Sequence, residues 1–179
     1  MLTEEKTINS ERIYEGVIIN LRKDHVTVRD GKTSWREIVE HNGGVAIAAF
    51  TDAGKMVMVR QYRKAAEQVV LEVPAGKIDN SEEHYVAAKR ELLEETGYSA
   101  QNLVHIMAFY SSIGFCTEVI HLYLATGLIA GKTSFDESED IEILEYDLDE
   151  LLAMVWRGEI IDAKTVVAIQ AAKLRNFGL

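Results

Sequence analysis

The chain has 179 residues, of which 47% are apolar, which predicts one domain with a sizeable core and argues against intrinsic disorder. Its net charge of −10 and isoelectric point near 5.0 argue against non-specific binding to nucleic acid or to an anionic membrane. Cys116 is the single cysteine, which excludes an intrachain disulfide framework and fits a reducing compartment. The sequence shows neither an apolar signal segment nor a run of about 18 apolar residues, so we expect a cytoplasmic protein without a membrane partner.

The first half of the chain is rich in strand signals. Residues 13–74 consist mainly of β-branched and apolar runs separated by turn residues. Asp30-Gly31 is a strong hairpin signal between two of these runs, and Pro74, the only proline, ends the last one. The predicted strands are Tyr14–Leu21, His25–Val28, Trp35–Glu40, Gly44–Thr51, Lys55–Tyr62 and Val69–Val73.

The hydrophobic period changes after Pro74. Glu82–Thr96 is predicted to be a helix, with Asn80 or Ser81 as its N-cap residue and Gly97 just beyond its end. Further strands are predicted at Leu103–Phe109, Val119–Ala125 and Ile141–Glu145.

Two helices are predicted near the C-terminus. Asp147 begins the first, with Glu150 placed for a capping-box contact, and Gly158 ends it. Asp162 is expected to cap a last helix that runs to about Asn176. Strands first, one helix between strands, and helices at the end predict an α/β sandwich with a mixed sheet.

Three carboxylates fall on one side of the predicted helix, namely those of Glu91, Glu94 and Glu95, at about 100° of rotation per residue. The opposite side, expected to pack on the core, carries Tyr85, Val86, Leu92 and Leu93. Like charges at this spacing cost about a few tenths of a kcal/mol per pair. A bound Mg²⁺ would relieve that repulsion, because it prefers carboxylate and phosphate oxygens. A solvated acidic face, with Arg90 paired to Glu94, is the alternative, and position alone does not decide.

The residues around this helix resemble the signature box of the Nudix hydrolases. The pattern begins with Gly76-Lys-Ile-Asp-Asn-Ser-Glu82 and continues, after seven residues, with Arg90-Glu91-Leu92-Leu93-Glu94-Glu95-Thr96-Gly97-Tyr98. The positions that match in type and spacing are Gly76, Glu82, Arg90, Glu91, Leu92, Glu94, Glu95, Gly97 and Tyr98. The resemblance implies a Nudix-type α/β/α sandwich with a mixed β-sheet and an N-terminal antiparallel strand region.

The resemblance also implies roles for the box residues. Glu91 and Glu95 would be the main ligands of a divalent cation, Mg²⁺ with Mn²⁺ as a substitute, and Glu94 an additional or water-mediated ligand. The backbone carbonyl of Ala75 would be a further ligand, and Arg90 would orient the glutamates. The positions with a structural role would be Gly76, Glu82 and Gly97.

Segments outside the box look most like the ADP-ribose pyrophosphatase branch of the family. They are Val59–Arg63, Leu71–Gly76 and Asp162–Thr165. In that branch, water attacks one phosphorus of ADP-ribose and yields AMP and ribose 5-phosphate. Ile113 stands where many members carry proline, which leaves another nucleoside diphosphate sugar open as the substrate. A module that senses ADP-ribose without cleaving it, and a hydrolase of damaged nucleoside triphosphates, are the competing functions.

A general base has to come from outside the box. Related enzymes supply a catalytic glutamate from the acidic loop that precedes the predicted strand Ile141–Glu145. Glu139 is therefore the first candidate and Glu137 the second. Without the resemblance, a solvated acidic loop is the simpler interpretation of these residues.

Substrate contacts are predicted from other strands. Arg63 is the candidate for pairing with a phosphate, ahead of Arg60. Trp35 is a candidate for stacking on adenine, with cross-strand packing as its alternative. Glu72 would accept a hydrogen bond from the adenine amino group or a ribose hydroxyl, or be an ordinary strand-edge acid. Gly114 also fits the family pattern on the substrate side.

The remaining predictions concern assembly and other reactive side chains. By resemblance we expect a homodimer with a nucleotide-sugar substrate, in which residues 1–42 form the dimer and residues 43–179 the catalytic core of a single domain. The histidines are scattered along the sequence without metal-ligand spacing, and Cys116 is expected to be structural rather than nucleophilic.

Overall fold

The computed structural model describes residues 3–79, 81–131 and 140–175. The chain forms two compact units. The first, called the N-terminal unit below, contains Met1–Gly43 and Tyr110–Val119. The second, called the core unit, contains Gly44–Phe109 and Ile120–Leu179. No helix in the described ranges is both long and apolar enough to cross a membrane.

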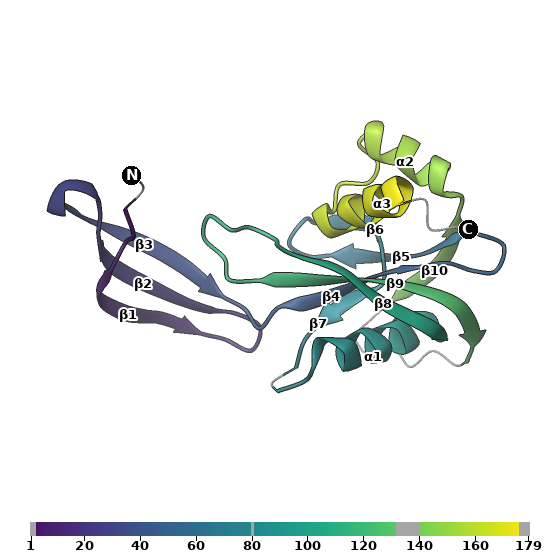
Figure 1. Ribbon diagram of the computed structural model, residues 1–179, viewed down its shortest axis with the longest axis horizontal. Coiled ribbons are helices and arrows are strands. Elements are labelled where there is room, and N and C mark those ends of the chain that lie inside the picture. Colours follow the sequence, from purple (N-terminus) through teal and green to yellow (C-terminus); the bar gives the residue numbers. More distant parts are fainter. Residues whose placement is uncertain (1–2, 80, 132–139, 176–179) are drawn as a thin grey trace. The chain divides into compact units, whose positions relative to one another are not determined.

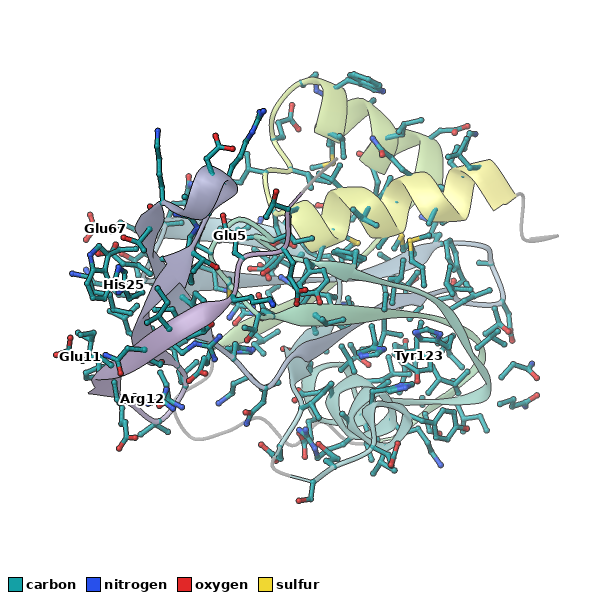
Figure 2. All side chains as sticks on the ribbon, turned by 60° about the vertical axis from the view of Figure 1, so that its left-hand side comes forward. Glu5, Glu11, Arg12, His25, Glu67 and Tyr123 are labelled. Carbon is teal, nitrogen blue, oxygen red and sulfur yellow. The ribbon has the colours of Figure 1, made fainter. Side chains whose placement is uncertain are left out.

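The N-terminal unit is built on a three-stranded antiparallel sheet in the order β1-β2-β3 (Figure 1). The strands are β1 (Thr7–Glu15), β2 (Asn20–Thr27) and β3 (Thr33–Glu40). Glu40 forms ion pairs with Arg12, labelled in Figure 2, and with Arg22. Among the described residues of this unit, Val26 is the one apolar side chain that is buried. Strand pairing and ion pairs therefore hold the sheet together more than an apolar core does.

The two turns of this sheet differ in how well the sequence predicts them. Asp30 and Gly31 adopt the left-handed conformation, with φ of 62° and 69°, so the hairpin prediction is confirmed. The predicted strand Tyr14–Leu21 is wrong, because β1 ends at Glu15 and a turn follows in which Gly16 N donates to Ile19 O at 3.0 Å. The β-branched residues in this turn suggest a strand, but Val17 is fully exposed and buries nothing.

The core unit contains two sheets. The mixed sheet has the order β7-β4-β9-β8, with β4 parallel to β9 and antiparallel to β7. Its strands are β4 (Gly44–Ala49), β7 (Ala75–Lys77), β8 (Tyr98–Tyr110) and β9 (Val119–Ala130). The second sheet, in the order β10-β5-β6, is antiparallel, with β5 (Met56–Arg63), β6 (Gln68–Glu72) and β10 (Ile141–Tyr146). The short strand β7 is absent from the sequence predictions, and β8 and β9 are longer than predicted.

Helices cover the core unit from two sides (Figure 1). They are α1 (His84–Thr96), α2 (Leu148–Trp156) and α3 (Ala163–Arg175). One apolar cluster joins α1 to the mixed sheet through Ala88, Leu92 and Val45. A second cluster joins α2 and α3 to the strands through Leu151, Ile169 and other side chains. The predicted α/β/α sandwich with a mixed sheet and an N-terminal antiparallel region is confirmed.

The helix ends show where local capping rules hold and where they do not. Gly97 ends α1 in the left-handed conformation and donates to Leu93 O at 2.8 Å, as predicted. Asp162 caps α3 by accepting from Thr165 N at 3.0 Å, also as predicted. The Asp147 side chain makes no capping hydrogen bond at the start of α2, so the predicted capping box with Glu150 is wrong.

The predicted N-cap of α1 is also wrong. Its N-cap residue is Glu83, without a side-chain cap, while Ser81 is in the left-handed conformation with φ of 66° and Asn80 lies outside the described residues. The carboxylate of Glu82 instead holds this turn, since it accepts from Asp79 N at 3.3 Å and from Arg90. The end of α3 near Asn176 lies outside the described residues as well.

Candidate active site

Helix α1 lies on the mixed sheet through its small residues. Ala87, Ala88, Leu92 and Glu95 are buried, while Tyr85, Val86 and Leu93 are 47%, 53% and 41% exposed. The predicted core-facing side is therefore wrong for these three residues and right for Leu92. The side chain of alanine is a single methyl group, so the helix side that carries alanines can approach a sheet closely. In α1 this side packs on the sheet, although larger apolar side chains lie elsewhere on the helix. As a result, the carboxylates differ in burial, and Glu95 is the most deeply buried of them.

Glu95 is held against the start of β7. Its side chain is 4% exposed, and its Oε2 accepts a hydrogen bond from Ala75 N at 2.9 Å. Burying a carboxylate is costly unless it is hydrogen-bonded, and this bond offsets part of that cost. It also brings Glu95 to the residue whose carbonyl the sequence predicts as a further metal ligand.

Gly76 forms a cradle for the second predicted ligand. A Cβ atom built on Gly76 would overlap the carboxylate of Glu91, carbon and oxygens alike. The side chain of Glu91 is 13% exposed, so the absent methyl group leaves the space that this carboxylate occupies. Glycine is therefore required here for the space it leaves rather than for an unusual backbone conformation.

Arg90 links the carboxylates of the box. Its Nη1 donates to Glu91 Oε1 at 2.7 Å and to Glu94 Oε2 at 3.0 Å. Its Nε and Nη2 bond both oxygens of Glu82, at 3.1 and 2.9 Å, and Nη2 also reaches Lys77 O at 3.0 Å. The hydrogen bond from Arg90 lowers the pKa of Glu82, and the same bond, with those to Glu91 and Glu94, raises the pKa of Arg90. The guanidinium thus fixes the loop before α1 to the glutamates of that helix.

The donor set fits a hard divalent cation. In the described ranges, no three His, Cys, Asp or Glu side chains converge closely enough to hold a metal ion by themselves. Mg²⁺ does not require such a cage, since it usually keeps several waters and binds one or two carboxylates together with substrate phosphates. Glu91, Glu95 and the Ala75 carbonyl supply only oxygen, and the Gly76 cradle keeps room for the Glu91 carboxylate.

Arg63 and Glu72, two predicted substrate residues, bind each other. Arg63 Nε and Nη2 donate to the two oxygens of Glu72, at 2.7 and 2.9 Å, and Lys164 of α3 also bonds Glu72. Glu72 is 2% exposed, whereas the Arg63 side chain is 42% exposed. Burial raises the pKa of Glu72, but the bonds from Arg63 and Lys164 lower it by more. The exposed part of the Arg63 side chain is therefore accessible to an anionic substrate. Both carboxylate oxygens of Glu72, in contrast, already accept hydrogen bonds from Arg63.

Lys164 and Thr165 are joined to this group by contacts that no sequence pattern predicts. Lys164 Nζ bonds Asp162 Oδ2 at 3.0 Å in addition to Glu72, and Thr165 Oγ1 accepts from Val73 N at 3.0 Å. One sequence feature points to a partner of this kind: Glu72 is an acid inside an apolar run, and a buried acid requires a cation nearby.

The other predicted substrate residues have varied surroundings. Arg60 pairs with Glu142 across β5 and β10. Trp35, in the N-terminal unit, stacks on His25, which is labelled in Figure 2, with ring centroids 4.5 Å apart. This contact fits cross-strand packing, the alternative role predicted for Trp35. A Cβ on Gly114 would meet open space. Glu137 and Glu139, the candidate bases, lie outside the described residues.

Three histidines that are distant in sequence come together between α1 and the mixed sheet. His84 stacks on His121 at 4.1 Å, and His121 Nδ1 lies 3.3 Å from His105 Nε2. His84 also hydrogen-bonds Tyr123, labelled in Figure 2. The first residue of α1 is thus attached to β8 and β9 by this group, called the histidine cluster below. Burial, with the nearby His84 and His105, lowers the pKa of His121.

The histidine cluster predicts an acid-sensitive fold. Because the pKa of His121 is lowered on folding, the unfolded chain binds more protons below its own pKa of about 6.5, so the free energy of unfolding should fall as pH drops through that value. Denaturant unfolding from pH 8 to pH 5 should show this fall, and His121→Gln should reduce it. His25→Gln, which removes a histidine outside the cluster, is the matched control. An equal pH dependence in both variants would contradict the prediction.

Comparisons with known proteins show the family of this chain. The NUDIX domain model matches residues 40–167, and the model of the nucleoside diphosphate sugar hydrolase N-terminal domain matches residues 5–39. An ADP-ribose pyrophosphatase of Bacillus subtilis (strain 168) is 47% identical over 97% of this chain and 95% of its own. A methanol dehydrogenase activator of Bacillus methanolicus is 44% identical over 98% and 96%. The crystal structure of an ADP compounds hydrolase shares the fold, with a TM-score of 0.87 and 21% identity over 99% of this chain and 97% of that one. The chain therefore belongs to the Nudix hydrolase family.

Proposed function

We propose that this protein is a Mg²⁺-dependent pyrophosphohydrolase that cleaves the diphosphate of ADP-ribose, or of a similar nucleoside diphosphate sugar. The observation that carries the proposal is the junction of β7 and α1, where Glu95 binds Ala75 N and the space at Gly76 receives Glu91. The identity of 47% to an ADP-ribose pyrophosphatase supports ADP-ribose as the substrate.

The box residues would hold the metal ion. Glu91, Glu95 and the carbonyl of Ala75 are the proposed ligands, with Glu94 as an additional or water-mediated one; Mn²⁺ is expected to substitute for Mg²⁺. The bound ion supplies Lewis acidity, which polarises the phosphoryl oxygens and acidifies the attacking water. Arg90 keeps Glu91 and Glu94 in place through its two hydrogen bonds from Nη1.

The reaction also needs a base. We propose that Glu139, or failing that Glu137, accepts the proton of the attacking water. The water oxygen bonds to one phosphorus, the bond from that phosphorus to the bridging oxygen breaks, and the bridging oxygen leaves with the other phosphate. ADP-ribose would give AMP and ribose 5-phosphate.

Binding of the diphosphate and nucleoside is proposed for residues on other elements. Arg63, held rigidly by Glu72, presents its exposed edge to a phosphate, which makes Glu72 a support for that cation as well as a candidate contact. Arg60 would have to leave Glu142 to bind substrate, so it is the weaker choice. Trp35 and Gly114 remain candidates for the adenine and the rest of the nucleotide sugar.

A product assay tests the proposed function. The full-length protein should release AMP from ADP-ribose with Mg²⁺ or Mn²⁺, and lose this activity with EDTA. A panel that adds ADP-glucose, GDP-mannose, NADH and diadenosine polyphosphates identifies the preferred substrate. Ile113, 77% exposed where the family often carries proline, makes a preference for another nucleotide sugar the main alternative within the enzymes.

A second candidate is a binding module that senses ADP-ribose or a related metabolite and acts through a partner. The relative named as a methanol dehydrogenase activator, at 44% identity, favours an effect on another enzyme. Saturable binding of ADP-ribose without turnover in Mg²⁺ or Mn²⁺ would favour this candidate, and rapid release of AMP would count against it.

We also propose a cytoplasmic homodimer made of one Nudix domain per chain, with residues 1–42 forming the dimer and residues 43–179 the catalytic core. Each residue of β1 is exposed in the single chain, including Ile8, Ile13 and Tyr14 at 54%, 50% and 56%. Exposed apolar side chains on a sheet with so small a core suggest that a second copy covers them.

A matched pair of substitutions tests the dimer. Ile13→Asp should raise the dimer dissociation constant by about tenfold or more, because burial of an isoleucine contributes about 1.5–3 kcal/mol. Ile129→Asp, at a side chain 52% exposed in the core unit, should leave the association unchanged. Light scattering during dilution measures both. A native protein that stays monomeric at high concentration would refute the proposal.

A further inference from the structure

The segment Glu72–Ala75 joins the two sheets of the core unit, since β6 ends at Glu72 and β7 begins at Ala75. All four of its residues are buried. The carbonyl proposed as a metal ligand belongs to its last residue. The direction of that carbonyl therefore depends on how firmly this short connection is held.

Four different elements hold the segment, and each of its four residues has at least one of these contacts. Arg63 of β5 and Lys164 of α3 bind the Glu72 side chain. Thr165 of α3 accepts from Val73 N, as described above. Pro74 O accepts a hydrogen bond from Ile47 N of β4 at 2.9 Å, and Ala75 N donates one to Glu95 of α1. Since the proline ring also fixes φ at Pro74, this short connection has one backbone torsion fewer with which to absorb a shift at Val73.

Thr165 is placed to set the position of Val73. Its side chain is completely buried, and Oγ1 donates its single proton to Asp162 Oδ2 at 2.6 Å. The Oγ1 lone pairs are thereby left to accept from Val73 N at 3.0 Å. Valine at position 165 would keep the shape and remove this acceptor, so Val73 N–H would be buried without its partner.

We propose that Thr165 is a positioning residue for the metal site: through Val73 and Pro74, the first turn of α3 sets the direction of the Ala75 carbonyl and the place of the Glu95 carboxylate. The inference rests on the proposed metal-dependent function. It makes α3, distant in sequence from the box, part of the machinery that holds the ion. Supporting residues of this kind typically change metal affinity by about 10- to 100-fold when removed.

Direct Mn²⁺ binding tests the inference without relying on turnover. With the full-length protein, the electron paramagnetic resonance signal of free Mn²⁺ should show about tenfold weaker binding in Thr165→Val, and native affinity within about twofold in Thr165→Ser. The Mg²⁺ concentration at half-maximal rate should rise by the same factor as the Mn²⁺ dissociation constant. KM for substrate at saturating Mg²⁺ should stay unchanged.

Controls separate positioning from loss of stability. Ile169→Ala removes buried side-chain atoms from the same helix but keeps the hydrogen bond from Val73 N to Thr165, and it should lower the melting temperature but keep native Mn²⁺ affinity. Equal weakening in this variant and in Thr165→Val would overturn the inference. If Thr165→Val does not fold, Thr165→Ala is judged by the same criteria.

The outcomes also distinguish this inference from the function beneath it. Glu95→Gln, the positive control, should abolish strong Mn²⁺ binding. Native affinity in folded Thr165→Val, beside lost affinity in Glu95→Gln, would overturn only the positioning role. A native protein that binds no Mn²⁺ would overturn the metal site and this inference together.

Discussion

Replacement of Glu95 by glutamine should abolish most of the activity and leave the fold intact. The amide oxygen of the new side chain can still accept from Ala75 N, so the buried hydrogen bond at 2.9 Å has a substitute, whereas the negative charge at the metal is lost. A metal ion stabilises a transition state by several kcal/mol, and about 1.4 kcal/mol is tenfold in rate, so kcat should fall by about 100-fold or more. Release of AMP at saturating Mg²⁺ measures the effect.

The matched control is Glu83→Gln, the same chemical change at an exposed carboxylate beside the first residue of α1. It should keep native kcat, and thermal unfolding should show both variants folded. Glu94→Gln should have an intermediate effect, because that side chain is 40% exposed and proposed only as an additional ligand. Full activity in Glu95→Gln would remove the central support of the proposed function.

Replacement of Gly76 by alanine should damage both stability and metal binding. The new methyl group would occupy the position of the Glu91 carboxylate, so this carboxylate or the β7 backbone has to move. Overpacking of this kind costs about 1–3 kcal/mol. Loss of a contact that supports a metal ligand typically weakens metal binding by about 10- to 100-fold. Displacement of Glu91, itself a proposed ligand, should weaken Mg²⁺ binding by at least as much. Thermal unfolding and the Mg²⁺ dependence of the rate measure the two effects.

Gly54→Ala provides a control that separates lack of space from backbone strain. Gly54 has φ of 74°, so alanine there is strained by about 1–2 kcal/mol, but a Cβ would meet nothing within 4 Å. It should lower stability without changing Mg²⁺ affinity. If Gly76→Ala behaves in the same way, the cradle at Gly76 does not position Glu91.

Features that depend on neighbouring residues were predicted well. The left-handed Asp30 and Gly31, the end of α1 at Gly97 and the Asp162 cap of α3 each depend on a few adjacent residues, and each is confirmed. The predicted strand at Tyr14–Leu21 failed because β-branched residues are also present in an exposed turn, and composition does not register exposure.

The buried side of α1 could not be predicted from the helix alone. Hydrophobicity correctly favours Leu92 as buried, but it also favours the exposed Tyr85, Val86 and Leu93. The sheet instead accepts Ala87 and Ala88, because small residues let the helix approach closely. Whether a carboxylate such as Glu95 is buried depends on the N–H that β7 presents to it, 20 positions earlier in the chain.

The Nudix family can be recognised from the sequence alone, because the spacing from Gly76 to Tyr98 is a local pattern of glutamates, arginine and glycines along one short strand, one loop and one helix. Tertiary structure decided which of those groups is buried and what supports them. Lys164 reaches Glu72 across 92 positions of sequence, and Thr165 reaches Val73 across the same separation. Contacts of this range depend on how distant elements pack, and a local pattern cannot encode that packing.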